Sequence, residues 1–408
     1  MTDRLYYTDS FLQQFDAHVV RVEGETGAIT LDRSAFYPTS GGQLSDTGWL
    51  DVAEANGVAM HLRVKDVTED ESTGDVLHLV AEDVRVLPTG ARVRGAIDAE
   101  RRRDHMQQHS GQHVLSAAFE RLYGFVTVSF HMGDESCSID LATEKLSPKQ
   151  IETAECMANE IIAEDRGVEV RFATPEEARR MGVRKIPPAE REKLRLIDIQ
   201  EFDLNACGGT HVRTTGQIGG LLLRKTEKVK QGVRVEFVCG LRAVRTARRD
   251  FQTLTDAAAL FSTHIGEVPQ QVQKALDEIR AGQKAQHRLL EEVAELLAGR
   301  LLESVGDCSG HKLVVQFLPE RDLGFVKMLA QKLTRAGKVV ALLGCGGSQP
   351  SLVFAQTPGL PHDMGVLMKR TVERLGTRGG GGRDMAQGGA PESAAAEQAL
   401  HEASNAIG

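Results

Sequence analysis

The stretch ERRRDHMQQHSGQHVLSAAFERLYG, residues 100–124, decides how the centre of this chain folds. Its apolar residues recur at helical spacing and Gly124 suits a helix end, so we expect a helix from about 97 to 122. His109 and His113 are four residues apart and therefore lie on one face of that helix. His105 precedes His109 by the same interval, so spacing alone also allows the pair His105 and His109.

A second pair of metal-ligating residue types stands much further along the chain. Cys207 and His211 are spaced C-x-x-x-H across Gly208 and Gly209, and small residues let both side chains turn inward. Three imidazoles and one thiolate suit zinc better than magnesium or calcium, which prefer oxygen ligands. We therefore expect one Zn²⁺ per chain, and the alternative is a set of ordinary core or surface side chains.

The composition is that of a globular protein with several domains. The chain has 408 residues, of which 41% are hydrophobic and 26% charged. The first residues lack a secretory signal, and no apolar run approaches the roughly 20 residues of a membrane helix. Six scattered cysteines do not form a disulfide framework at this length. We expect a cytoplasmic protein with reduced thiols and no membrane partner.

Positive charge is concentrated locally although the net charge is -8. Arg101, Arg102 and Arg103 form a triplet at the start of the predicted helix, and a second basic run extends over residues 224–249. A basic face beside a metal site would suit a polyanionic substrate, whereas a solvated surface is the alternative.

The pattern along the chain predicts an α+β protein of four parts. Residues 1–95 alternate in short runs typical of a small β-barrel, and residues 96–245 predict a helix backed by antiparallel sheet that carries the zinc site. Residues 246–305 predict a helical hairpin or short coiled coil. Residues 306–408 alternate strand and helix and predict a small α/β domain.

Two glycine-rich stretches could bring the backbone close to a ligand. Ser40-Gly41-Gly42-Gln43 lies within the predicted barrel, where a plain hairpin turn is the alternative. Four consecutive glycines at 379–382 precede Arg383, and these fit either a flexible linker or a contact with phosphate.

Several of these motifs resemble those of one family. HSGQHVL at 109–115 and CGGTH at 207–211 resemble the paired zinc signatures of alanyl-tRNA synthetase editing domains and of the free-standing AlaX-type editing proteins. FYPTSGGQ at 36–43 resembles the signature of the barrel that precedes the editing domain, and GGGGRDMAQ at 379–387 is similar to the DHHA1-type C-terminal domain. No counterpart of the aminoacylation domain is found, so we expect the long free-standing form.

The resemblance implies a trans-editing hydrolase that deacylates alanine-specific tRNA mischarged with serine, and also with glycine. It identifies His109, His113, Cys207 and His211 as the zinc ligands and leaves His105 outside. It further implies that 306–408 is a DHHA1-like tRNA-binding domain.

The general base is not assigned, because no H-E-x-x-H motif supplies a glutamate. In related proteins the strand at TVSFHMG borders the amino-acid pocket, but the glutamine common there is missing. The catalytic candidates are Thr39, Ser40, Ser129, His131 and Thr210. The candidates for binding substrate or tRNA are Gly41, Gly42, Gln43, Arg101, Arg102, Arg103, Arg224, Lys225, Gly380, Gly381 and Arg383.

Two other functions are compatible with the same residues. The zinc could brace a tRNA-binding module without turnover, because four protein ligands fill a tetrahedral shell. Alternatively, the chain could be a zinc hydrolase of a small ester or amide. A homodimer through the helical or the C-terminal region is a further expectation.

Overall fold

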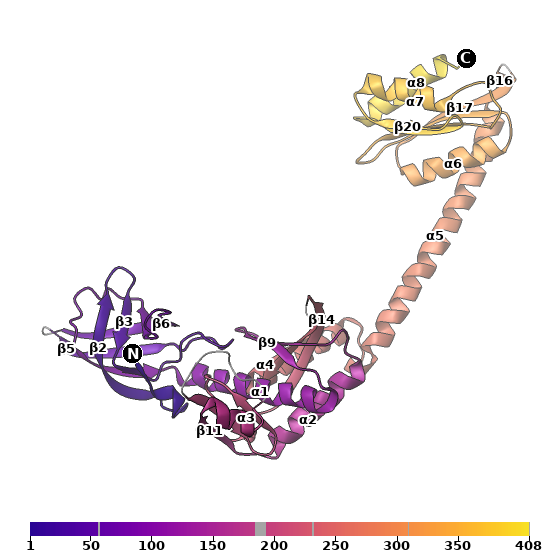
Figure 1. Cartoon of the computed structure of the whole chain (residues 1–408). Coiled ribbons are helices and arrows are strands. Elements are labelled where there is room, and N and C mark those ends of the chain that lie inside the picture. The colour runs from indigo at the N-terminus through magenta and orange to yellow at the C-terminus, as the bar shows by residue number, and fades with distance from the viewer. Residues whose placement is uncertain (56–57, 184–192, 231, 309, 408) are drawn as a thin grey trace. The chain divides into compact units, whose positions relative to one another are not determined.

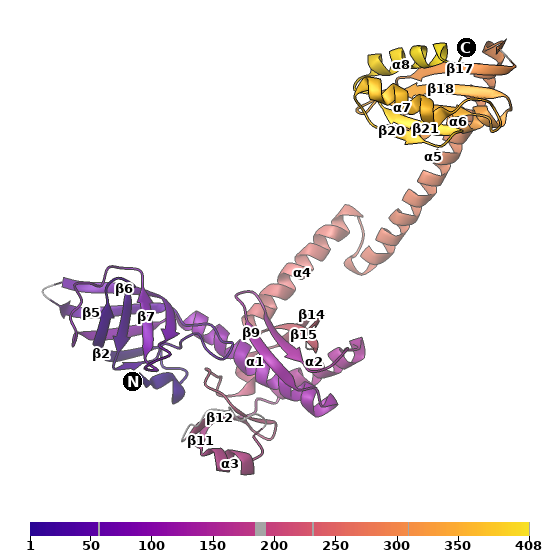
Figure 2. The same cartoon turned by 45° about the horizontal axis from the view of Figure 1, so that its top comes forward.

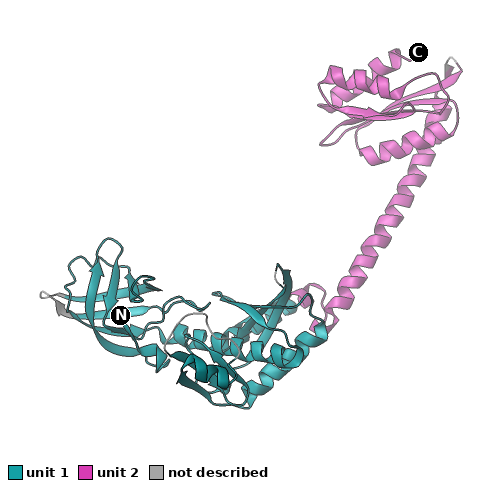
Figure 3. Ribbon diagram, viewed as in Figure 1, with its two compact units in different colours: residues 1–256 teal, residues 257–408 magenta. Residues whose placement is uncertain are grey.

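The fold is known from a computed structural model that describes residues 1–55, 58–183, 193–230, 232–308 and 310–407. The chain forms two compact units, residues 1–256 and 257–408 (Figure 3). A closed barrel, open sheets and helices confirm the mixed α+β class (Figure 1). In the described part of the chain, no helix has the length and apolar character needed to cross a membrane.

A closed six-stranded barrel begins the first unit, as its alternating sequence predicts. In β2 (Gln14–Glu23), Phe15, Ala17 and Val19 point into the barrel core while the residues between them are exposed. The strands run in the order β2-β3-β7-β6-β5-β8. The other five are β3 (Ala28–Leu31), β5 (Gly48–Ala55), β6 (Val58–Glu69), β7 (Val76–Val80) and β8 (Arg92–Ile97). A short parallel ladder joins β1 (Asp3–Arg4) to β4 (Arg33–Ser34), and η1 covers Leu5–Tyr7.

Helix α1 (Ala99–Tyr123) is the predicted histidine helix, and it forms the centre of the rest of this unit. The Asp98 carboxylate accepts hydrogen bonds from the first-turn amides, and Gly124 ends the helix with φ 70°. Fifteen consecutive positions of this helix, 105–119, are buried, and they include glutamines, histidines and serines as well as apolar residues. Buried polar side chains normally have hydrogen-bond partners, so those of α1 indicate a role for this helix besides packing of the core.

Two antiparallel sheets and two further helices surround α1. One sheet has the order β14-β15-β10-β9 and the other β11-β12-β13. The strands of the first are β9 (Thr127–Met132), β10 (Cys137–Leu141), β14 (Leu221–Val229) and β15 (Gly232–Cys239). Those of the second are β11 (Val168–Ala173), β12 (Leu194–Ile199) and β13 (Asp203–Ala206). The helices are α2 (Pro148–Ala163) and α3 (Pro175–Arg180), and η2 covers Thr215–Ile218.

The predicted helical region consists of α4 (Gly240–Leu260), η3 (Ile265–Glu267) and α5 (Val268–Ser304). Its first helix follows β15 directly and begins at Gly240, six residues before the expected start at 246. Leu290 and Leu297 of α5 pack against the core of the second unit. Other large apolar residues of α5 are exposed: Val272, Leu276, Ile279, Leu289, Val293 and Leu296.

A six-stranded sheet of order β16-β17-β18-β19-β21-β20 forms the second unit, with α5 and α6 packed on one core and α7 and α8 on another (Figure 2). Among the described residues of this sheet, β17 and β18 pair in parallel and the other ladders are antiparallel. The strands are β16 (Asp307–Cys308), β17 (His311–Leu318), β18 (Val339–Cys345), β19 (Ser351–Gln356), β20 (Gly379–Gly381) and β21 (Met385–Gly389). The helices are α6 (Leu323–Arg335), α7 (Met364–Leu375) and α8 (Ser393–Asn405).

Three of the four consecutive glycines, Gly379–Gly381, form a paired strand, which excludes the flexible-linker interpretation. β20 pairs with β21, and a Cβ on Gly379 would lie 2.6 Å from the Gly388 Cα. A Cβ on Gly381 would meet the Met385 carbonyl oxygen at 2.4 Å. Glycine is therefore required here by close approach of two strands.

Candidate metal centre

The structure brings the four predicted ligands together. His109 and His113 come from α1, and Cys207 and His211 come from the loop after β13. One ligand atom from each residue lies within 4.8 Å of all the others. The Cys207 Sγ is 3.4 Å from His109 Nε2 and 3.3 Å from His211 Nε2. His105 is not part of this group, so of the two pairs that spacing allows, the cluster uses His109 and His113.

The two glycines of the loop have different roles. A Cβ on Gly209 would lie 2.1 Å from the His109 Cε1, which no side chain could tolerate. A Cβ on Gly208 would lie at an ordinary 3.6 Å from the Tyr7 Oη. Contact with a ligand histidine therefore requires glycine at 209 and not at 208.

Each imidazole uses Nδ1 for a contact outside the cluster. His109 Nδ1 is 2.7 Å from Gln43 Oε1, and His211 Nδ1 is 3.2 Å from Ser110 Oγ. His113 Nδ1 is 3.3 Å from Asp203 Oδ2. Such outer partners fix the tautomer and the ring orientation of a ligand histidine, and they leave Nε2 for an ion.

The electrostatics of the group favour an ionised thiol. Burial opposes charge on Cys207, but the nearby His109 and His211 outweigh it and place the pKa of the thiol well below its usual value. Burial also opposes charge on His113, yet Asp203 and Cys207 raise its pKa to about 9. Burial lowers the pKa of His211 to about 3. A thiolate, together with imidazoles that release their Nε2 protons when an ion binds, is a donor set for a soft or borderline cation, so these residues could hold a metal ion.

A cavity of about 320 Å³ opens beside this group. It is bordered by α1, β9 and the end of β13, and three of the four cluster residues line it. The other lining residues are Gly41, Gln112, Ser116, Glu120, Val126, Thr127, Val128, Ser129, Phe130, Asn205 and Ala206. A substrate in this cavity would therefore reach the cluster directly.

Sequence reasoning missed a polar network in the cavity wall. Ser116 Oγ accepts hydrogen bonds from Gln112 Nε2 and Thr127 Oγ1, both at 2.8 Å. Gln112 and Ser116 follow His109 by three and seven positions and so share its helix face. That spacing was the available signal, because polar residues on the ligand face of a buried helix point to the site.

The five catalytic candidates differ in whether they border the cavity. Ser129 lines the cavity and donates to Asp140 Oδ2 at 2.7 Å. Thr39 and Ser40 are exposed in the barrel turn, and the Thr39 hydroxyl accepts from the Ser45 amide. His131 is exposed and does not border the cavity. Thr210 is fully buried, accepts from Gln43 Nε2 and does not border the cavity, so its hydroxyl does not face a substrate there.

The glycine turn of the barrel docks on β9. Gly41 borders the cavity, as its predicted role requires. A Cβ on Gly42 would lie 2.5 Å from the Phe130 carbonyl oxygen, and the Gly42 carbonyl accepts from the Met132 amide. Gln43 is fully buried between His109 and Thr210. The prediction that Gln43 contacts substrate is therefore wrong, because its side-chain amide hydrogen-bonds to His109 and Thr210 inside the protein.

One of the basic candidates also requires correction. Arg102 is 1% exposed and binds the Asp46 carboxylate and the carbonyls of Ser10 and Ala35. The prediction that it contacts tRNA is wrong, since its guanidinium is saturated inside the protein. Arg103 is exposed, and Arg101 donates to the Ser45 carbonyl. On the surface, Arg224 pairs with Asp250 and Lys225 with Glu227.

The C-terminal candidates lie in the second unit. Gly380 borders a cavity of about 270 Å³ together with Arg378, Ser351 and Gln387. Gly381 is exposed but held against β21, and Arg383 is exposed with its Nε 3.5 Å from the His362 carbonyl.

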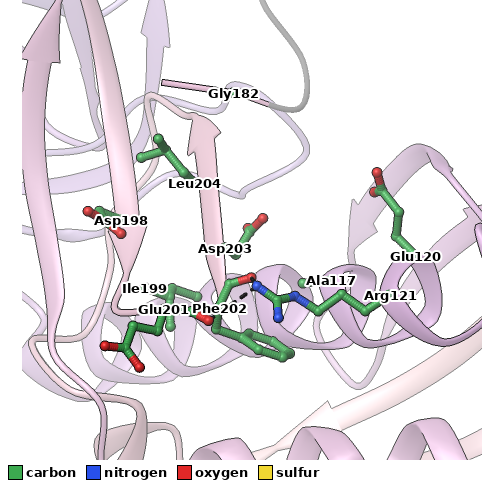
Figure 4. A pocket seen from close by; sticks show the side chains of 10 residues that line it. All are labelled: Ala117, Glu120, Arg121, Gly182, Asp198, Ile199, Glu201, Phe202, Asp203 and Leu204. Carbon is green, nitrogen blue, oxygen red and sulfur yellow. Dashed lines mark hydrogen bonds between the residues drawn. The ribbon is translucent and has the colours of Figure 1, made fainter. Parts of the chain in front are cut away.

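A second cavity, of about 440 Å³, lies against the far part of β13. Figure 4 shows Arg121 beside Phe202, where its guanidinium lies 4.7 Å from the ring centroid and donates to the Phe202 carbonyl. Four carboxylates line this cavity: Glu120, Asp198, Glu201 and Asp203. They would repel a phosphodiester, so the cavity beside the metal cluster is the better place for the end of a nucleic acid.

The sequence matches two family models. Residues 194–235 match the threonyl and alanyl tRNA synthetase second additional domain, and residues 6–101 match the class II (A) tRNA synthetases. Residues 194–235, which include Cys207 and His211 of the cluster, are thus similar to the second additional domain of those synthetases.

Individual relatives extend over nearly the whole chain. The alanyl-tRNA editing protein AlaX-L of Pyrococcus horikoshii is 29% identical over 393 residues, which cover 95% of this chain and 94% of the relative. The alanine–tRNA ligase of Archaeoglobus fulgidus is 32% identical and aligns with 95% of this chain, but with 42% of the ligase. That of Pyrococcus abyssi is 30% identical and aligns with 98% of this chain and 43% of the ligase. The chain thus spans less than half the length of these ligases.

The chain is homologous to the AlaX-type alanyl-tRNA editing proteins and to part of the alanine–tRNA ligases, which confirms the resemblance seen in its motifs. Among solved structures, the C-Ala domain of Aquifex aeolicus alanyl-tRNA synthetase matches 26% of this chain and 91% of that domain at 21% identity. Its TM-score of 0.22 does not establish a common fold for that region.

Proposed function

We propose that this chain deacylates alanine-specific tRNA that is mischarged with serine or glycine. The observation that carries the proposal is the convergence of His109, His113, Cys207 and His211 beside a cavity that three of them line. Homology to an alanyl-tRNA editing protein supports the substrate class. The bond that is broken is the ester between the amino acid and a terminal ribose hydroxyl.

Zn²⁺ is the ion that we propose for the cluster. Three imidazoles and a thiolate in a buried group of four match its preferred ligands and coordination number. When bound, zinc would polarise the ester carbonyl or lower the pKa of a water molecule. The side chains of Gln43, Ser110 and Asp203 orient the imidazoles.

The cavity wall supplies a means of telling serine from alanine. Ser116 Oγ accepts two hydrogen bonds, so its own proton is the group left for donation. A serine hydroxyl could join the Ser116 and Thr127 hydroxyls, whereas the alanine methyl group would leave them without that partner. We propose these two residues, together with Ser129, as the serine contacts.

The tRNA body is proposed to meet exposed basic residues of both units. Arg103, Lys228 and Lys230 are exposed in the first unit, and Arg378 and Arg383 belong to the glycine-rich hairpin of the second.

The division into parts 1–95, 96–245, 246–305 and 306–408 is proposed as a functional division. A homodimer is supported by the exposed apolar residues of α5, and light scattering would test it.

The test is deacylation of seryl-, glycyl- and alanyl-tRNA(Ala) by the full chain, with zinc measured on the same preparation. We expect release of serine and glycine, little release of alanine, and loss of activity after chelation. Protection of the seryl ester without release would support the zinc-braced binding module. Equal rates on seryl-tRNA and on a short seryl-nucleotide fragment would support a hydrolase of small esters.

A further inference from the structure

Arg195 of β12 is a buried cation beside the metal loop. It is 8% exposed, and no described carboxylate forms an ion pair with it. Its guanidinium is bound by backbone carbonyls instead, and it lies over the Tyr7 ring at 5.5 Å from the centroid. A buried charge without a carboxylate is costly, so its retention calls for an explanation.

The contacts of Arg195 are directed at the loop that supplies two ligands. Nη1 donates to the Cys207 carbonyl at 2.8 Å and to the Gly209 carbonyl at 2.9 Å. One nitrogen thus gathers two carbonyls of the short turn between Cys207 and His211. The Cys207 amide in return donates to the Arg195 carbonyl at 3.1 Å. Together these bonds fix the backbone from which the Cys207 side chain projects.

The same guanidinium ties this loop to the N-terminal segment. Nε donates to the Tyr7 carbonyl at 2.9 Å. The His211 amide donates to Ser10 Oγ at 3.3 Å, and the Ser10 carbonyl accepts from Arg102 at 2.7 Å. Residues 7–10 therefore contact the metal loop through these hydrogen bonds, although they lie near the start of the sequence.

We infer that Arg195 is a positioning residue that holds the metal loop against residues 7–10, and that retention of the metal depends on a guanidinium at this position. The inference rests on the proposed metal centre. Lysine would keep the positive charge, but its single ammonium lacks the planar fork that reaches carbonyls in several directions. Geometry and charge can therefore be separated by Arg195→Lys.

The test measures zinc release from the full-length protein into a chelating dye, and the visible spectrum of the Co²⁺-substituted protein. Removal of an outer-shell partner typically weakens metal binding by about 10–100-fold, so we expect R195K to release zinc at least about tenfold faster. We also expect a changed Co²⁺ spectrum, since the thiolate and imidazoles lose their fixed arrangement. The same release rate and spectrum as the unaltered protein would overturn the inference.

Arg242→Lys is the matched control. Arg242 is 7% exposed and binds Asp104 and the Gly133 carbonyl, away from the metal loop. Arg242→Lys should lower stability, because a buried guanidinium again loses its hydrogen bonds, and it should leave the rate of zinc release unchanged. If R242K releases zinc as fast as R195K, a specific role for Arg195 is overturned. Ser10→Ala supplies a milder variant if R195K does not fold. It should speed release by about threefold, and unchanged release would overturn the role of residues 7–10.

Absence of metal from the unaltered protein would defeat the proposed metal centre itself. Metal binding that is indifferent to R195K and S10A would defeat only this inference.

Discussion

Helices α1 and α5 place their residues in opposite environments. α1 has 25 residues and buries histidines, glutamines and serines together with its apolar side chains. α5 has 37 residues, all described, and buries only Ala294 and Ala298 while several leucines and valines stay exposed. Buried polar residues require partners, and those of α1 find them in distant segments. The four grouped metal-ligating side chains thus belong to the part of the chain where polar residues are enclosed.

The largest effect is expected from the ligand face of α1. His113→Ala removes one of four donors, so zinc content should fall to near zero and deacylation should drop by more than the 10–100-fold typical of outer-shell changes. Zinc analysis and single-turnover deacylation would check this. His287→Ala, on the exposed surface of α5, is the control and should change neither quantity. Full zinc content in H113A would remove His113 from the ligand set.

A smaller effect is expected from a pair of glycines in the metal loop. In Gly209→Ala the new methyl group would press on the His109 ring, so zinc affinity should fall by about 10–100-fold. Gly208→Ala has room and should bind zinc normally. Competition with a chelator of known affinity would measure both. Equal affinities for the two variants would contradict the placement of His109 against Gly209.

The third prediction concerns pH and His105, which also lies on α1. Burial, assisted by the charge of Arg101, lowers the pKa of His105 from 6.5 to about 4. Between pH 6.5 and 4, His105 is therefore protonated in the unfolded chain but neutral in the folded protein. The free energy of unfolding should fall as the pH falls through this range, by up to about 3 kcal/mol. Urea unfolding at pH 7 and pH 5 would show a weaker pH dependence in His105→Asn. An unchanged pH dependence would contradict the burial of a neutral imidazole.

The smallest effect is expected on α5. Leu296 is 72% exposed, so Leu296→Ala should change the free energy of unfolding by less than about 0.5 kcal/mol. Leu115 of α1 is fully buried, and Leu115→Ala should cost about 2–5 kcal/mol. Chemical denaturation would measure both. A large cost for L296A that depends on protein concentration would show instead that a second copy covers this face.

The sequence predicted the helices, the strands and the grouping of the four metal-ligating residues better than it predicted which side chains hydrogen-bond to the three histidines. Helical spacing allowed His105 with His109 as well as His109 with His113, and the resemblance to the editing domains chose the second pair, which the structure groups with Cys207 and His211. Gln43 and Asp203 lie 66 and 90 residues from the histidines that they hold. Their roles depend on how the barrel turn and β13 dock on α1, which no local pattern encodes.

Composition was misleading where two segments approach closely. The glycines at 379–381 have the composition of a linker, but they form a strand because β21 leaves no room for side chains. Arg102 belongs to a basic triplet with the composition of a tRNA contact, yet it is enclosed with Asp46. In both cases tertiary packing decides the role of a residue.

X-ray absorption at the zinc edge of the full-length, metal-loaded protein tests the central claim most directly. One zinc per chain, with a single sulfur at about 2.3 Å and three nitrogens at about 2.0 Å, is the predicted result. A shell without sulfur, or one made of oxygens, would contradict the assignment of Cys207 and the three histidines to a common ion.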